Sequence, residues 1–267
     1  MNTIVTAIIS VAVIGAACAF VLSLASKFMA VKVDERAAKL LECLPGSNCG
    51  ACGYPGCAGY AEALNTEPDI KMNLCAPGGA ETLKKISAIL GGDADADMEM
   101  DVRAAVVHCR GSLSVQQKKM EYKGIKTCAA ASRIFGGERG CAFGCLGYGD
   151  CQAVCPSGAV CIEDGLANIN QNCTACGLCV KACPNKLISI ENKTLSSVVL
   201  CKNLEKGAAV RKKCSMGCIA CGKCVRECQY GAITIVDNLA KIDYDKCMDC
   251  GHCAETCVTK CITLYRA

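Results

Sequence analysis

The sequence predicts an α+β protein with an N-terminal transmembrane helix, a small cysteine-rich domain and two similar modules in tandem. Three observations carry this prediction. The chain has no charged residue before Lys27, residues 46–57 combine cysteines and glycines with almost nothing that could pack a core, and one plan of strand, cysteine run and helix recurs in the C-terminal half. In chain order, we expect an anchor at 1–30, a small domain at 31–90, an acidic linker at 91–104, a connecting segment at 105–135, a first module at 136–192, a second connecting segment at 193–213 and a second module at 214–267.

The run from Ile4 to Ala25 is almost continuously apolar. It is long enough to cross a bilayer, since about 20 residues suffice for a helix. A cleaved signal peptide is the alternative, but the run lacks a basic start and a clear small-x-small cleavage site. Lys27, Lys32 and Arg36 follow the span and no basic residue precedes it. The positive-inside rule therefore predicts a single-pass protein of the cell membrane, with its N-terminus outside and the rest of the chain in the cytoplasm.

Cysteine dominates the composition: the chain of 267 residues has 28 Cys and only 2 His, which are His108 and His252. Secreted disulfide scaffolds are usually much shorter. Structural zinc sites often mix Cys with His, which this chain hardly offers. Repeated C-x-x-C-x-x-C-x-x-x-C spacing is instead typical of iron–sulfur ligation. The cysteines are therefore expected to be thiolate ligands in a reducing compartment.

Other functional classes find little support. The net charge of +4, the absence of a basic run and the aromatic content of 4% argue against nucleic-acid binding. No G-x-G-x-x-G sequence follows a predicted strand, and no nucleophile or general base stands out. We therefore expect an electron carrier without a catalytic site or a nucleotide-binding site of its own.

The short elements follow from periodicity and composition. Residues 33–44 place charges on one side and Ala and Leu on the other, as an amphipathic helix does, and residues 58–64 are helical by composition. Acidic and small residues alternate in 91–101, which indicates a solvated linker; a divalent-ion site is the alternative there. Strands are expected at 159–164, 188–190, 232–237 and 262–264.

The cysteine runs predict two tandem ferredoxin-like modules with two [4Fe-4S] clusters each. In two-cluster ferredoxins, three cysteines of one run hold one cluster and the fourth crosses to the other cluster. The expected quartets of the first module are Cys141, Cys145, Cys151 with Cys183, and Cys173, Cys176, Cys179 with Cys155. Those of the second module are Cys218, Cys221, Cys224 with Cys257, and Cys247, Cys250, Cys253 with Cys228. Two departures from the usual pattern are the longer gaps after Cys141 and the lack of proline after Cys228 and Cys257.

Four further cysteines flank the joint between the modules: Cys109, Cys128, Cys201 and Cys214. Either they hold an extra cluster or they are packed without a ligand, because spacing alone does not show proximity. Cys161 and Cys261 are expected to pack as small residues, and His252 is expected to be solvated. Two clusters in each module and one in the opening domain make five expected [4Fe-4S] clusters. The extra quartet would make six.

The opening motif has its own spacing, Cys49-x2-Cys52-x4-Cys57, followed by Cys75. A helix after Cys57 would return Cys75 to the other three thiolates, so this domain is expected to hold a single [4Fe-4S] cluster. "LPGSNCGACGYPGC", "YAEAL" and "CAPGG" resemble the single-cluster domain of the Rnf membrane complex B subunit and of some corrinoid iron–sulfur proteins. The N-terminal span, "HCRG", "CAFGCLGYGDCQAVCP" and the ferredoxin-like repeats make nearly the whole chain similar to the Rnf B subunit family.

This resemblance implies a subunit of an ion-motive membrane complex, a translocase that oxidises reduced ferredoxin. Electrons pass to NAD⁺ or another acceptor, coupled to translocation of Na⁺ or H⁺. The B subunit would accept electrons from soluble ferredoxin on the cytoplasmic side and relay them to other subunits. A membrane-tethered polyferredoxin that serves a hydrogenase or a carbon monoxide dehydrogenase is the alternative.

Basic residues lie near the predicted clusters: Lys181, Lys186, Lys223, Arg226 and Lys246. They could dock an acidic ferredoxin by charge complementarity. Ordinary solvated charges are the simpler interpretation, because exposed Lys and Arg are common on any protein surface.

Overall fold

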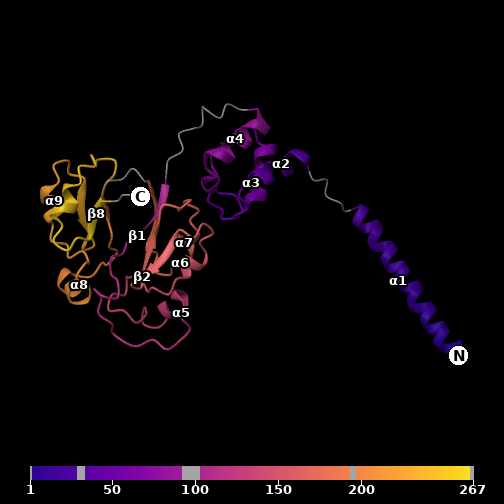
Figure 1. The fold of residues 1–267 in the computed structure, drawn as a ribbon, viewed down its shortest axis with the longest axis horizontal. Helices are drawn as coiled ribbons and strands as arrows, with labels where there is room; N and C mark the ends of the chain where they lie inside the picture. Colours follow the sequence, from indigo (N-terminus) through magenta and orange to yellow (C-terminus); the bar gives the residue numbers. More distant parts are fainter. Residues whose placement is uncertain (1, 29–33, 92–102, 193–196, 265–267) are drawn as a thin grey trace.

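The computed structural model describes residues 2–28, 34–91, 103–192 and 197–264. Figure 1 shows a long N-terminal helix, then a small helical domain, then two lobes that contain short strands. The α+β class is confirmed. The acidic linker predicted at 91–104 lies outside the described residues except at its two ends.

Helix α1 (Asn2–Phe28) coincides with the apolar N-terminal run. Its side chains include exposed Ile8, Val11, Ile14 and Leu22. Over the residues that the structure describes, no helix reaches the length and apolarity of a membrane span. The predicted helix is therefore confirmed, and its place in the membrane stays a prediction.

The opening domain packs three α-helices beside its cysteine loop: α2 (Glu35–Cys43), α3 (Cys57–Thr66) and α4 (Gly79–Leu90). The first two were predicted and the third was not; a short 3-10 turn, η1 (Ala76–Gly78), leads into it. The buried side chains of Leu40, Tyr60, Leu64 and Ile86 form a small apolar core. Cys52, Cys57 and Cys75 pack against this core from the cysteine loop.

The first module combines two antiparallel strand pairs. β1 (Arg103–Val107) pairs with β4 (Ile188–Asn192), so its first and last strands lie side by side. β2 (Val160–Glu163) and β3 (Leu166–Ile169) form a hairpin. The short helices are α5 (Cys128–Ser132), α6 (Asp150–Ala153) and α7 (Leu178–Ala182). The predicted strands at 159–164 and 188–190 are thus confirmed within a residue or two.

The second module repeats this plan. β5 (Ser197–Val199) pairs with β8 (Ile262–Leu264), and β6 (Ile233–Val236) pairs with β7 (Leu239–Ile242). Its helices are α8 (Gly207–Lys213), α9 (Lys223–Glu227) and α10 (His252–Thr256). The same pairing of first with last strand in both modules confirms the internal repeat that the cysteine runs predicted.

Both modules begin earlier than predicted. β1 crosses the expected boundary between the linker at 91–104 and the connecting segment at 105–135, and β5 lies in the expected connecting segment at 193–213. Unlike the predicted strands, neither follows a cysteine run, and each pairs with a strand far along the chain. The two connecting segments therefore belong to the modules themselves.

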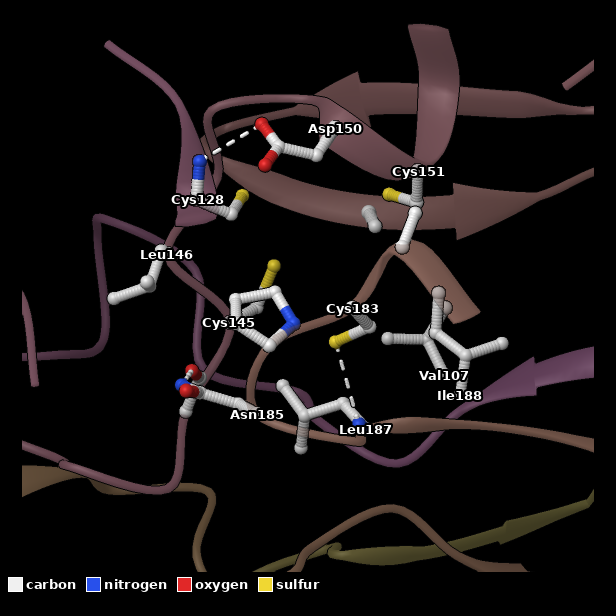
Figure 2. A pocket seen from close by; sticks show the side chains of 14 residues that line it. Val107, Cys128, Cys145, Leu146, Asp150, Cys151, Cys183, Asn185, Leu187 and Ile188 are labelled. Carbon is white, nitrogen blue, oxygen red and sulfur yellow. Dashed lines mark hydrogen bonds between the residues drawn. The ribbon is translucent and has the colours of Figure 1, made fainter. Parts of the chain in front are cut away.

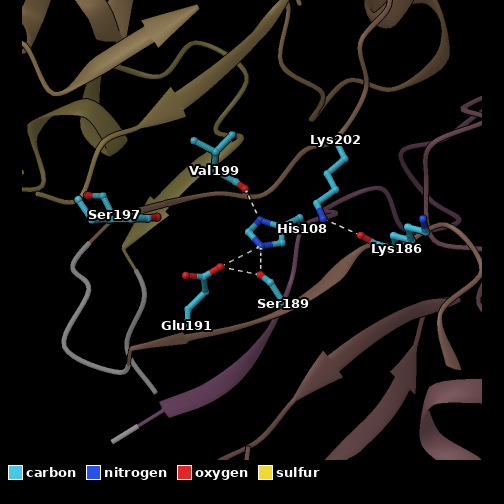
Figure 3. Close-up of polar contacts among 8 residues, drawn as sticks. His108, Lys186, Ser189, Glu191, Ser197, Val199 and Lys202 are labelled. Carbon is cyan, nitrogen blue, oxygen red and sulfur yellow. Dashed lines mark hydrogen bonds and ion pairs between the residues drawn. The ribbon is translucent and has the colours of Figure 1, made fainter. Parts of the chain in front are cut away.

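Hydrogen bonds from the loops that follow the first strands connect the two modules (Figure 3). His108 Nδ1 lies 2.8 Å from the carbonyl oxygen of Val199, and its Nε2 lies 2.5 Å from the Ser189 hydroxyl. Lys202 Nζ donates to the carbonyl oxygen of Lys186 at 2.6 Å. Burial lowers the pKa of His108, while the Val199 carbonyl and Glu191 act in the opposite direction.

One guanidinium is fully buried in the first module. Arg139 is 1% exposed. It donates to the carbonyl oxygen of Gly111 at 3.0 Å and to that of Gly165 at 2.5 Å. Because hydrogen bonds from charged donors are about twice as strong as neutral ones, Arg139 ties the loop after β1 to the turn between β2 and β3.

Candidate iron–sulfur centres

The opening domain brings its four predicted ligands around one cavity of about 310 Å³: Cys49, Cys52, Cys57 and Cys75. The Cys57 amide donates to Asn48 Oδ1 at 2.8 Å. Gly56 has a φ of +129°, a conformation suited only to glycine. The predicted helix after Cys57 is present, and Cys75 lines the same cavity as the first three thiols.

This opening quartet lies against the first module. Lys181 Nζ donates to the carbonyl oxygen of Cys49 at 2.8 Å. Lys181 lies in α7, between Cys179 and Cys183. One side chain therefore links the cysteine loop of the opening domain to a cysteine-bearing helix of the first module.

The first module contains one quartet as predicted, Cys155, Cys173, Cys176 and Cys179, around a cavity of about 280 Å³. The Ala105 amide of β1 donates to Cys173 Sγ at 3.3 Å. Burial raises the pKa of the Cys179 thiol to about 11. Metal binding must therefore displace a proton from this sulfur, as it does at thiolate sites in general.

The second quartet of this module differs from the prediction. Its cavity is lined by Cys128, Cys145, Cys151 and Cys183 (Figure 2), so Cys128 stands where Cys141 was expected. Asp150 positions Cys128, because its carboxylate accepts hydrogen bonds from the amides of Cys128 at 2.8 Å and Ala129 at 2.9 Å. The Leu187 amide donates to Cys183 Sγ at 3.4 Å. The predicted grouping is thus corrected at one residue.

Iron analysis can test this corrected quartet. We expect Cys128→Ser to lose about four irons and about four sulfides per chain, the content of one cluster. Cys145→Ser should lose the same cluster, so the double variant should lose no more than either single variant. Cys161→Ser, a change in β2 outside the cavities described, is the matched control in anaerobically purified full-length chain. Twice the loss in the double variant would place Cys128 and Cys145 in separate clusters.

In the second module, one predicted quartet surrounds a cavity of about 350 Å³: Cys228, Cys247, Cys250 and Cys253. The other predicted quartet is also brought together: Cys218 and Cys224 are buried in one core, Cys257 packs against it, and Cys221 lies near Cys224. Both groupings agree with the crossed pattern of ferredoxin runs.

Cys261 lies beside the second of these quartets. It is buried, as predicted for a packed small residue, but its Sγ lies only 3.7 Å from Cys257 Sγ. Hydrogen bonding with Cys261 lowers the pKa of Cys257 to about 5, and hydrogen bonds with Cys218 and Cys257 raise the pKa of Cys261. Cys261 therefore stabilises the thiolate form of a predicted ligand, a role that the sequence did not indicate.

A further cavity, between the modules, is lined by Cys109, Cys141, Cys201 and Cys214. Three of these were expected together; Cys141 takes the place of Cys128. Burial raises the pKa of the Cys109 thiol to about 12. Within the described ranges, no group of three or more His, Cys, Asp or Glu side chains is arranged to hold a single metal ion. The cysteine groups surround cavities, which suits a cluster of several metal atoms.

The remaining predicted polar residues lie at the surface. His252 is half-exposed and faces Glu227 and Glu255, at 3.7 and 3.5 Å, in agreement with its expected solvation. Lys246 pairs with Asp243 at 3.0 Å, and Arg226 donates to the Cys221 carbonyl oxygen at 3.4 Å. These basic side chains therefore have partners within the chain, and contact with ferredoxin stays untested.

Comparison with known families agrees with the iron–sulfur interpretation. Residues 44–77 match a family described as a putative Fe-S cluster domain, residues 169–189 a 4Fe-4S binding domain, and residues 217–261 a 4Fe-4S dicluster domain. These three segments contain the opening quartet and the regular runs of both modules. Iron–sulfur domains are therefore present at both ends of the globular part of the chain.

Curated relatives match almost the full length. The B subunit of the Na(+)-translocating ferredoxin:NAD(+) oxidoreductase complex of Acetobacterium woodii is 38% identical over 98% of this chain and 78% of its own. The B subunit of the proton-translocating ferredoxin:NAD(+) oxidoreductase complex of Clostridium ljungdahlii is 37% identical over 98% and 92%. The B subunit of the ion-translocating oxidoreductase complex of Methanosarcina acetivorans is 36% identical over 98% and 99%.

Proposed function

Because the chain belongs to the family of B subunits of the ion-translocating ferredoxin:NAD(+) oxidoreductase (Rnf) complexes, we propose that it is the electron-relay subunit of such a complex. The observation that carries this proposal is the succession of cysteine quartets from the opening domain to the second module. The full-length match to B subunits favours this function over that of a tethered polyferredoxin serving a hydrogenase or a carbon monoxide dehydrogenase.

Five [4Fe-4S] clusters are assigned by this proposal. Their ligands are Cys49, Cys52, Cys57, Cys75; Cys155, Cys173, Cys176, Cys179; Cys128, Cys145, Cys151, Cys183; Cys218, Cys221, Cys224, Cys257; and Cys228, Cys247, Cys250, Cys253. A bound cluster accepts and releases one electron at a time. The chain supplies thiolates, and backbone amides such as those of Ala105 and Leu187 donate to their sulfurs. Such hydrogen bonds stabilise the reduced cluster and raise its potential.

Soluble ferredoxin is the proposed electron donor. Exposed Arg226 and Lys246 lie one or two residues from Cys228 and Cys247, ligands of one proposed cluster. The positive charges of these two side chains would attract an acidic ferredoxin and speed its association. Other subunits of the complex would then bind NAD or flavin and couple electron flow to Na⁺ or H⁺ movement.

The membrane anchor is also a proposal. It rests on the charge-free sequence before Lys27 and on the basic residues Lys27, Lys32 and Arg36 that follow. This arrangement would put the N-terminus outside and the clusters on the cytoplasmic side. Expressed without partner subunits, the full chain should resist carbonate extraction from membranes, and a chain lacking residues 1–30 should not. Equal extraction of both would contradict the anchor.

The relay function is tested in the complex itself. We expect anaerobic purification through a tag on this chain to recover the other subunits and ferredoxin-dependent NAD⁺ reduction. Cys176→Ser should lose about four irons per chain and most of that activity, because it removes a ligand within a matched cluster domain. Cys161→Ser should keep both. If Cys176→Ser lost its irons but kept full activity, the electrons would not pass through this chain as proposed.

A further inference from the structure

Four thiols from both modules meet at one cavity in the joint. Cys109 follows β1 and Cys201 follows β5, so they occupy equivalent places in the two modules. Cys141 comes from the first module, and Cys214 ends α8 of the second. All four line the cavity, which measures about 310 Å³.

The sulfurs of this group are surrounded by hydrogen-bond donors. Cys109 Sγ accepts from the amides of Gly111 and Cys145, both at 3.4 Å. Cys201 Sγ accepts in the equivalent way from the amides of Asn203 at 3.5 Å and Cys218 at 3.4 Å. Amides directed at sulfur stabilise a thiolate, as they do around cluster ligands.

Asn203 adds a side-chain donor to this arrangement. Its Nδ2 lies 3.3 Å from Cys141 Sγ, and Asn203 is only 2% exposed. It comes from the second module, whereas Cys141 belongs to the first. The buried amide therefore fixes a sulfur across the joint.

The walls of the cavity are held by backbone contacts between the modules. Gln116 forms an antiparallel bridge with Cys214, and the Gln117 amide donates to the carbonyl oxygen of Lys213 at 3.2 Å. Lys213 in turn forms an ion pair with Glu205. Together with the hydrogen bond between His108 and Val199, these contacts keep the four cysteines in place. No disulfide contributes, because all four are free thiols.

We propose that Cys109, Cys141, Cys201 and Cys214 bind a sixth [4Fe-4S] cluster that connects the two modules. None of these cysteines lies within a segment that matches an iron–sulfur family. In each module one amide that donates to this group belongs to a ligand of a neighbouring cluster: the Cys145 amide donates to Cys109 Sγ in the first module, and the Cys218 amide donates to Cys201 Sγ in the second. One electron that arrives from either neighbour reduces this cluster, and the same electron leaves to the other, so no proton or further reactant is needed.

With this site assigned, almost every cysteine has a role. Outside the six quartets, the chain contains Cys18, Cys43, Cys161 and Cys261 alone. The proposal rests on the relay function and extends it, because the sixth cluster would connect the clusters of the two modules in one electron-transfer path.

The test uses the full chain in its complex, purified without oxygen. We expect Cys109→Ser and Cys201→Ser each to lose about four irons and about four sulfides per chain relative to Cys161→Ser. The double variant should lose the same amount, because both residues serve one cluster. Electron paramagnetic resonance of the reduced protein should lose one signal while those of the other clusters persist, which shows that the modules remain folded.

Three outcomes are distinguishable. Unchanged iron in Cys201→Ser, with loss in Cys176→Ser, overturns the sixth cluster but leaves the relay function intact. Loss of about one zinc with unchanged iron overturns the iron–sulfur assignment of this site. Unchanged iron in both Cys201→Ser and Cys176→Ser overturns the relay function as well.

The Asn203 contact gives a second readout. Asn203→Leu should leave the iron content unchanged and lower the reduction potential of one cluster, because a hydrogen bond to sulfur stabilises the reduced state. Unaltered potentials of all clusters would contradict a cluster at Cys141.

Discussion

Removal of the iron–sulfur clusters is expected to unfold both ferredoxin-like modules. Within the ranges that the structure describes, each sheet has two strands, and isolated two-stranded sheets are marginal in water. Cysteines occupy much of the buried core: Cys145, Cys151 and Cys179 pack with Val160 and Leu187 in the first module. Without clusters these thiols would line empty space, and the free energy of unfolding should fall close to zero, because cluster binding supplies most of the folding free energy.

Hydrogen exchange measures this directly. The backbone amides of all the strands from β1 to β8 should be protected from exchange in the intact protein. After the clusters are oxidised and their iron is chelated, these amides should exchange at rates near those of an unfolded chain. Rebuilding the clusters with iron and sulfide under reducing conditions should restore protection, which controls for chemical damage. Strands that stay protected in the iron-free chain would show that the apolar side chains suffice.

The opening domain is a useful comparison within the same experiment. The fully buried part of its core, which includes Leu40, Tyr60, Leu64 and Ile86, is apolar, and Cys52, Cys57 and Cys75 only pack against it. Protection in α3 should therefore decrease less than in the strands of the modules.

Local spacing made most quartets predictable. In C-x2-C-x2-C runs the loop itself brings three thiols around a cluster, as at Cys173, Cys176 and Cys179. The crossing ligands Cys155 and Cys257 follow from the ferredoxin rule. These groupings needed no knowledge of contacts between distant segments.

The exchange of Cys128 and Cys141 depends on such contacts. Cys128 reaches the first module because Asp150, far along the chain, binds the start of α5. Cys141 turns toward the second module, where Asn203 donates to its sulfur. Neither partner is visible in the spacing of cysteines, so the sequence could place these thiols near the joint but could not group them.

Strands β1 and β5 and helix α4 were not predicted, for different reasons. β1 and β5 were missed because neither follows a cysteine run, as the four predicted strands do; each pairs with the last strand of its module. Helix α4 did have a signal: Leu83, Ile86 and Leu90 recur at helical spacing. The helix was therefore predictable from its own residues, whereas the strands were not.

Gly147→Ala is expected to destabilise the first module by about 3 kcal/mol or more. Gly147 lies between Cys145 and Cys151 and has a φ of +77°, which costs a residue with a side chain about 1 kcal/mol. A Cβ here would also overlap the carbonyl oxygen of Gly165. That oxygen accepts a hydrogen bond from buried Arg139, and loss of a hydrogen bond from a charged group costs about 1.5–3 kcal/mol.

Gly158→Ala separates the two causes of this destabilisation. Gly158 has a similar φ of +62°, but a Cβ there would meet no atom within 4 Å. A cost of 1.4 kcal/mol corresponds to about a tenfold change in an opening equilibrium. Amides of the β2–β3 hairpin should therefore exchange about a hundredfold faster in Gly147→Ala and less than about tenfold faster in Gly158→Ala. Equal acceleration in both variants would mean that backbone strain alone acts, and that Gly165 and Arg139 do not restrain the cysteine loop.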